Sequence, residues 1–186
     1  MRSGWWLVLC WPLVALAQPD PIRADVVRHG DIVMLSVEFT VAVPQALAWE
    51  VMVDFDHMPA FLPQLDESRA VARSTNHLEV HQRGHYTVAG LPFSYESVRD
   101  VSLQPITEIR ARTLEGNAGR MESICDLQQR GEQTVVKYRA DWTPGSVWQS
   151  AIGTGFLKQQ LVRQFDAMQQ EMLRRKAHSI TPASAP

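Results

Sequence analysis

Apolar and polar side chains alternate most clearly over residues 33–43. The apolar residues, one at every second position, are Val33, Leu35, Val37, Phe39, Val41 and Val43. A period of two predicts a half-buried strand. Pro44 ends this strand and suits the first turn of a short helix. Pro59 and Pro63 then prevent the apolar segment 48–63 from continuing as one helix, so we expect a second short helix with a bend.

The same alternation recurs further along the chain, in runs that begin near residues 78, 93, 109, 121 and 136. Turns rich in glycine or proline separate these runs, at a spacing of about 11 to 14 residues. Short strands with such regular spacing predict an antiparallel meander. Together with the first strand, they predict a sheet of about six to seven strands.

A long helix is predicted over about residues 146–177. Its apolar stripe, at spacings of three or four residues, consists of Leu157, Leu161, Phe165, Met168 and Met172. Such a stripe must pack against another element. Gly153 and Gly155 interrupt the start of the helix, so we expect a bend there. We also expect these glycines to leave space inside the fold.

The first residues resemble an export signal. A short charged start, an apolar run and small residues before Gln18 are typical of a secretory signal peptide. The apolar run of about thirteen residues is shorter than the roughly 20 that span a bilayer. We therefore expect cleavage after Ala17 and a mature periplasmic protein, secreted across the inner membrane without a stable membrane span. The predicted organisation is a signal peptide (1–17), a loose lead-in (18–30), one domain (31–177) and a disordered tail (178–186).

Composition excludes several functions. The formal net charge is −2 and the basic residues are scattered, which argues against a nucleic-acid partner. Without the signal peptide Cys125 is the only cysteine, so no disulfide is expected.

No nucleophile elbow, phosphate-binding loop or dinucleotide motif is present. His77, His81 and His85 share a strand face, but residues four apart are about 13 Å apart along a strand, too far to share one metal ion. We expect neither a metal nor a cofactor.

Arg99 is the exception to the apolar alternation. It shares a strand face with Phe93 and Tyr95, so a regular strand would point it inward, where an unpaired charge is costly. A carboxylate, phosphate or carbonyl group of a ligand would satisfy it. Two alternatives remain open: a β-bulge that turns Arg99 outward, or a protein partner such as Asp141 or Glu50. Further polar residues on apolar strand faces are Gln82, Ser97, Thr113 and Ser123.

The order of elements resembles the START-like (SRPBCC) superfamily, in particular the polyketide cyclase and dehydrase type that includes coenzyme Q-binding START proteins. The residues that carry this resemblance are Ala48-Trp49, Val53-Asp54-Phe55, Pro59, Phe61 and Pro63. The resemblance covers roughly residues 31–177. It implies an α+β helix-grip fold, in which a curved antiparallel sheet wraps around the long C-terminal helix and two short helices follow the first strand.

The resemblance also implies an apolar cavity between the long helix and the sheet. The residues expected to bind a ligand there are Phe55, Met58, Phe61, Tyr86, Phe93, Tyr95, Arg99, Tyr138, Trp142, Gly155 and Phe156. We favour an exported carrier for an apolar or amphipathic small molecule, such as a lipid or a quinone-like compound. One alternative is a cyclase or dehydratase that uses the same cavity with Arg99 or Tyr86. Another is an envelope interaction module with a filled core.

The export signal generates a first prediction. N-terminal sequencing of the exported protein should start near Gln18, because the small residues before it suit the signal peptidase. An intact form beginning at Met1 in the membrane fraction would contradict this assignment.

Overall fold

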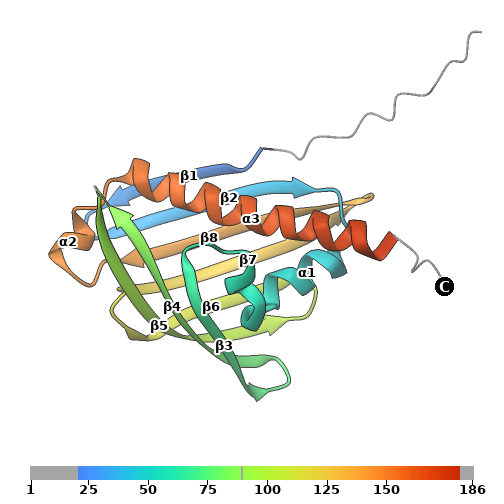
Figure 1. Cartoon of the computed structure of the whole chain (residues 1–186), viewed down its shortest axis with the longest axis horizontal. Helices are drawn as coiled ribbons and strands as arrows, with labels where there is room; N and C mark the ends of the chain where they lie inside the picture. The colour runs from blue at the N-terminus through green and yellow to red at the C-terminus, as the bar shows by residue number, and fades with distance from the viewer. Residues whose placement is uncertain (1–20, 89, 181–186) are drawn as a thin grey trace, which may run out of the picture.

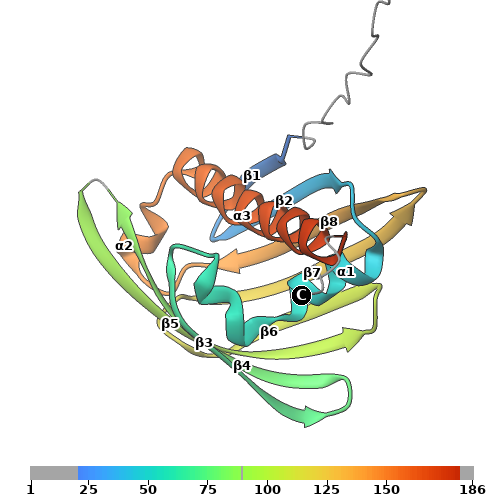
Figure 2. The same cartoon turned by 45° about the vertical axis from the view of Figure 1, so that its right-hand side comes forward.

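An antiparallel sheet of eight strands curls around one long helix, α3 (Thr154–Ile180). This computed structural model describes residues 21–88 and 90–180. Figure 1 shows α3 lying across the sheet, and Figure 2 shows the sheet curving so that α3 lies on its concave side. The predicted α+β helix-grip fold is therefore confirmed, with a strand count slightly above the prediction.

The order of strands across the sheet is β1-β2-β8-β7-β6-β5-β4-β3, so the first hairpin pairs with the last strand of a six-strand meander. The strands are β1 (Arg23–His29), β2 (Ile32–Val41), β3 (Leu65–Ser74), β4 (His77–Val88), β5 (Leu91–Gln104), β6 (Glu108–Gly116), β7 (Arg120–Arg130) and β8 (Gln133–Thr143). The other helices are α1 (Gln45–Val53), the 3-10 helix η1 (Phe55–Ala60) and α2 (Val147–Ser150). The two short helices thus follow β2, the strand that the sequence predicted as the first.

Two edge strands differ from the sequence prediction. Residues 23–29, predicted as part of a loose lead-in, form β1 and pair with β2 along their whole length. The partly buried side chains of β1 are those of Ala24, Val26 and Arg28. Because Ala24 is small and Arg28 is charged, the period of two is hard to recognise in the sequence. β3 is mostly exposed and has two register irregularities, which also remove a clear alternation.

The C-terminal helical region is divided as its glycines suggested. The predicted helix 146–177 is two helices, because α2 ends before Ala151 and α3 begins at Thr154. α3 then continues to residue 180, so residues 178–180 are helical, although they were assigned to the disordered tail. The predicted signal peptide (1–17) and residues 181–186 of the tail lie outside the described residues.

Packing is most complete from the middle of α3 to its C-terminal end. The buried residues of the predicted apolar stripe are Phe165, Met168 and Met172. The ring of Phe165 lies 6.0 Å from that of Phe39 in β2 and 5.1 Å from that of Tyr138 in β8, centroid to centroid. Burying a side chain of this size contributes about 1.5 to 3 kcal/mol. Leu157 and Leu161 are only partly buried, so the N-terminal half of α3 packs less completely.

An ion-pair cluster joins the segment between α1 and η1 to the end of α3. The Asp54 carboxylate accepts hydrogen bonds from Arg175 Nη2 and His57 Nδ1, each at 2.6 Å. Arg175 Nε also donates to Glu171 at 2.7 Å, and Arg174 Nε donates to the same carboxylate at 2.6 Å. These two guanidinium groups, that of Arg174 first, lower the pKa of Glu171 to about 2.

η1 is fixed to the edge of the sheet as well. Asp56 Oδ1 accepts a hydrogen bond of 2.7 Å from the backbone N–H of Ala70 in β3, which satisfies one free donor of an edge strand. Pro59 lies inside η1, where the sequence predicted a break in the helix. Phe55 and Met58 are buried beneath η1. The apolar segment 48–63 is therefore a bent cover over one end of the sheet.

We predict that substitutions along α3 have unequal effects. Phe165→Ala should lower the free energy of unfolding by about 3 to 5 kcal/mol, because it empties a buried site. Leu161→Ala should cost about 2 kcal/mol or less, since Leu161 is partly buried, and the exposed Lys158→Ala about 0.5 kcal/mol or less. Urea denaturation measures these differences, and equal losses for the three variants would show that another face of α3 is packed.

We also predict that the Glu171 cluster contributes stability that depends on pH. The pKa of Glu171 lies below its ordinary value of 4.5. Its contribution is therefore fully present above about pH 5 and is lost as the pH falls toward 2. Glu171→Gln should lower the free energy of unfolding by about 1 to 2 kcal/mol at neutral pH. The loss is no larger because solvent screens the largely exposed Arg174. In urea denaturation, the difference between the two proteins should shrink below about pH 4. A difference that stays constant with pH would contradict this role.

Candidate functional site

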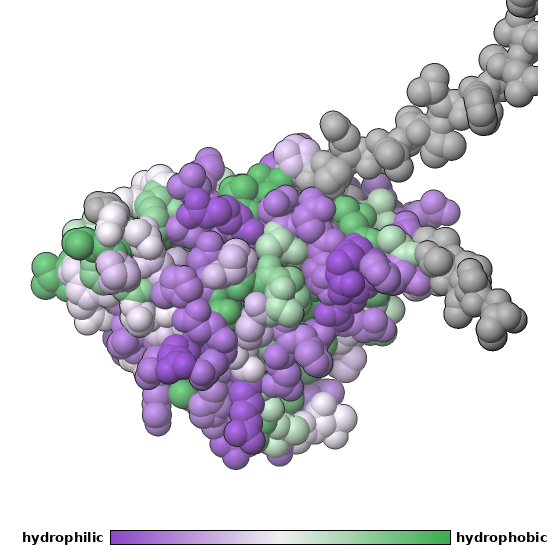
Figure 3. All heavy atoms as spheres, in the orientation of Figure 1, coloured by the Kyte–Doolittle hydropathy of each residue, from purple (hydrophilic) through white to green (hydrophobic). Residues whose placement is uncertain are grey.

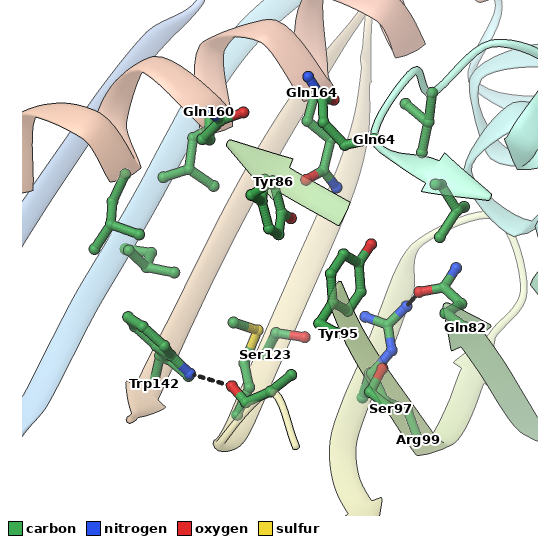
Figure 4. A pocket seen from close by; sticks show the side chains of 18 of the residues that line it. Gln64, Gln82, Tyr86, Tyr95, Ser97, Arg99, Ser123, Trp142, Gln160 and Gln164 are labelled. Atoms are coloured by element: carbon green, nitrogen blue, oxygen red, sulfur yellow. Dashed lines mark hydrogen bonds between the residues drawn. The ribbon is translucent and has the colours of Figure 1, made fainter. Parts of the chain in front are cut away.

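A cavity of about 290 Å³ lies between α3 and the concave face of the sheet. Figure 4 shows its side chains converging from α3 and from the strands below it. The strands supply every second residue to the lining, as the alternation predicts; the lining residues of β5 are Phe93, Tyr95, Ser97, Arg99 and Val101. The volume is close to the lower end of the range for small-molecule sites, about 300 Å³.

The structure brings together nine of the eleven residues that the sequence assigned to a ligand site. Those that line the cavity are Phe55, Met58, Tyr86, Phe93, Tyr95, Arg99, Tyr138, Trp142 and Phe156. Phe61 is outside the lining and packs against the core, and the next residue, Leu62, takes the inward position. Gly155 is exposed, and a Cβ added there would meet nothing within 4 Å. Gly155 therefore does not create the space inside the fold, contrary to the expectation from the sequence.

Several polar lining residues were not identified from the sequence. They are Gln64, Gln149, Gln160 and Gln164. Gln160 and Gln164 are one helical turn apart, beside Leu157 and Leu161. A helical wheel that treats glutamine as surface assigns both residues to the solvent side. Their spacing of four beside the apolar stripe was the available signal.

Arg99 points into the cavity. Its Nη2 donates a hydrogen bond to Gln82 Oε1 on the neighbouring strand β4. The register irregularity between β5 and β6 lies next to Arg99, but the extra residue is in β6, so β5 keeps its alternation. Asp141 and Glu50, the alternative partners, are both exposed to solvent. Arg99 therefore points inward, and its observed protein partner is the neutral Gln82 in place of Asp141 or Glu50.

Arg99 is also the one charged side chain among the described residues that line the cavity. In the described part of the chain, the buried side-chain nitrogen and oxygen atoms without a hydrogen-bond partner are Arg99 Nε and Gln160 Oε1. Both residues line the same cavity. A buried donor or acceptor without a partner costs about 1 to 3 kcal/mol. A ligand group that meets either atom, after a rotation of the side chain toward the open space, would remove that cost.

Three tyrosines surround this charge. Tyr86 stacks on Tyr95 with ring centroids 5.1 Å apart, and the Tyr138 hydroxyl lies 3.6 Å from Met121 Sδ. Burial raises the pKa of all three tyrosines, that of Tyr138 to about 12, although the charge of Arg99 acts in the opposite direction. The hydroxyls are thus protonated at neutral pH, and none of them neutralises the guanidinium group.

The three histidines that the sequence singled out lie outside the cavity. His77, His81 and His85 each pair with a carboxylate, respectively Asp100, Glu79 and Asp66, and none of the three lines the cavity. Within residues 21–88 and 90–180, no group of three potential metal ligands comes together. The Cys125 thiol does line the cavity, but burial raises its pKa to about 12, so the thiol is protonated.

Apolar residues continue from the cavity to the outside at the α2 end. The ring of Trp148 in α2 stacks on that of Phe93 at 4.3 Å, and both residues line the cavity. Nearby, Val147 is 90% exposed and Leu91 is 61% exposed. Figure 3 shows hydrophobic surface at this end of the molecule, on the left. None of the helices in the described residues has the length and apolar character needed to cross a membrane.

Comparison with known families identifies the domain. Residues 33–177 match the model of the family described as polyketide cyclase / dehydrase and lipid transport. No curated protein sequence matches the chain. The match covers the whole unit from the start of β2 to nearly the end of α3, including every element that forms the cavity.

Solved structures share the same fold at low sequence identity. A protein from Thermus thermophilus has a TM-score of 0.66 at 12% identity, covering 76% of this chain and 98% of that one. The Zhui aromatase/cyclase from Streptomyces sp. R1128 has a TM-score of 0.60 at 21% identity, covering 83% and 99%. A STAR-related lipid transfer protein from Xanthomonas axonopodis has a TM-score of 0.59 at 11% identity, covering 80% and 98%. The solved structures share the fold of this chain, and the family match shows that the chain belongs to the polyketide cyclase / dehydrase and lipid transport family.

Proposed function

We propose that this protein binds an apolar or amphipathic small molecule, such as a lipid or a quinone-like compound, in the cavity beneath α3. The observation that carries the proposal is the single guanidinium group of Arg99 in a mostly apolar cavity. Apolar walls favour a hydrophobic body, and a few polar groups set its orientation, which is the usual design of a small-molecule site.

The chemistry of Arg99 defines the polar part of the ligand. Gln82 is a neutral partner, so the guanidinium charge is not balanced inside the cavity. A carboxylate or phosphate would balance it, and a carbonyl oxygen would satisfy Arg99 Nε without full neutralisation. Acidic amphiphiles should therefore bind more tightly than neutral ones of the same length.

Carriage fits the site better than catalysis. A cyclase or dehydratase needs a group that exchanges protons near neutral pH. Among the described residues that line the cavity there is no aspartate, glutamate or histidine, and burial raises the pKa values of the tyrosines. The family description and the name of the Streptomyces protein keep a cyclase as the second candidate. The cavity itself argues against an interaction module with a filled core.

The first residues of the chain support a proposal for the place of action. The signal-like order of residues 1–17 supports export across the inner membrane into the periplasm. We propose that the protein carries its ligand through the periplasm, because a poorly soluble molecule would move through this aqueous compartment slowly on its own.

We predict that the neutral fluorophore phenylnaphthylamine binds the purified protein with a stoichiometry of one. Decanoic acid should displace it at lower concentration than decanol does. Arg99→Met should weaken decanoic acid at least tenfold, the effect of a hydrogen bond to a charged group, and should leave decanol nearly unchanged.

Arg130→Met is the matched control, because Arg130 is exposed at the tip between β7 and β8. This variant should behave as the wild type. Failure of the folded wild type to bind any of the three compounds would refute the carrier function. An unchanged preference for the acid in Arg99→Met would remove Arg99 from the site.

A further inference from the structure

Gln160 provides a second polar position in the cavity. Its Oε1 atom is buried and lacks a hydrogen-bond partner, as does Arg99 Nε, and no other buried side-chain nitrogen or oxygen in the described residues shares this state. The two atoms differ in chemistry, because a guanidinium N–H only donates and an amide oxygen only accepts. A ligand that satisfies both must carry an acceptor and a donor.

The two positions belong to different walls. Arg99 comes from β5 in the sheet, whereas Gln160 comes from α3, which covers the sheet. Figure 4 shows Gln160 at the helix side of the cavity and Arg99 at the strand side, with Tyr86 and Tyr95 drawn between them. A single molecule that reaches both polar positions would have to extend along the part of the cavity that these aromatic side chains line.

We infer that the ligand is polar at both ends: an acidic or carbonyl group binds Arg99, and a hydroxyl or amine group donates a hydrogen bond to Gln160 Oε1. This inference rests on the proposed carrier function and narrows its ligand class. A simple fatty acid would place a methyl group against Gln160 and leave the buried oxygen unsatisfied. A hydroxylated acid of suitable length would satisfy both positions.

The neighbours of Gln160 support selection against a methyl group. Leu157 and Leu161 line the cavity on either side of Gln160 along α3, so a leucine at position 160 would extend the apolar part of this helix wall. The chain instead has a polar amide there, which costs free energy when its oxygen is buried without a partner. A ligand hydroxyl group removes that cost.

The test compares matched ligands and matched variants. Octanoic, decanoic and dodecanoic acid, and the ω-hydroxy derivative of each, compete with phenylnaphthylamine for the full protein. At one of these lengths the hydroxyl group should strengthen binding to the wild type by about fivefold or more, the effect of one hydrogen bond. In Gln160→Leu the same hydroxyl group should weaken binding, and the unsubstituted acid should bind more tightly than it binds the wild type.

Gln159→Leu is the control, because Gln159 is the preceding residue of the same helix and is exposed. It should retain the wild-type preference, which excludes a general effect of leucine on α3. If the hydroxyl group has the same effect in the wild type and in Gln160→Leu at every length, the second polar position is wrong, while the carrier function stands. If the fluorophore binds but none of the acids displaces it, the inferred ligand with two polar ends is wrong. If neither the fluorophore nor any of the acids binds, the carrier function itself fails.

Discussion

The packing of α3 against the concave side of the sheet is the interaction on which the rest of the structure depends. The helix has a continuous apolar stripe, and only a curved sheet can cover it from several sides at once. From the middle of α3 to its C-terminal end, Phe165, which also borders the cavity, and Met172 fill the space below the helix. At the N-terminal half, Leu157 and Leu161 face the cavity instead. One helix therefore forms the core at one end of the molecule and the roof of the cavity at the other.

Because the packed end of α3 and the cavity end are different parts of the helix, the residues that stabilise the fold differ from those of the proposed binding site. The cluster of Asp54, Glu171 and Arg175 holds the packed end together, far along α3 from Gln160. At the α2 end, by contrast, Val147 and Leu91 are exposed apolar residues. Substitutions in the cavity should consequently alter binding while the packed end maintains the fold. Arg99 itself is a cost to folding in the free protein, because its charge lies in a mostly apolar site without an acidic partner.

Much of this architecture could be predicted from the sequence, because strand alternation is a local property. The inward orientation of Arg99 followed from the regular period of β5, and it survives the neighbouring irregularity because the extra residue is in β6. β1 was missed since Arg28 occupies a partly covered position. Gly155 was misplaced because its role depends on the rotation of α3 against the sheet, which the sequence does not encode locally. Gln160 was missed for the same reason, as an amide at the border of an apolar stripe can face either side.

The central claim is that the free Nε–H group of Arg99 anchors the polar end of the ligand. The most direct measurement follows the arginine Nε–H resonances by NMR during titration with decanoic acid, with the Arg99 signal assigned by its absence in Arg99→Met. If Arg99 binds the carboxylate, its signal should shift downfield and saturate at one equivalent, while the signals of exposed arginines such as Arg130 should stay in place. Saturable binding of the acid with an unmoved Arg99 signal would contradict it.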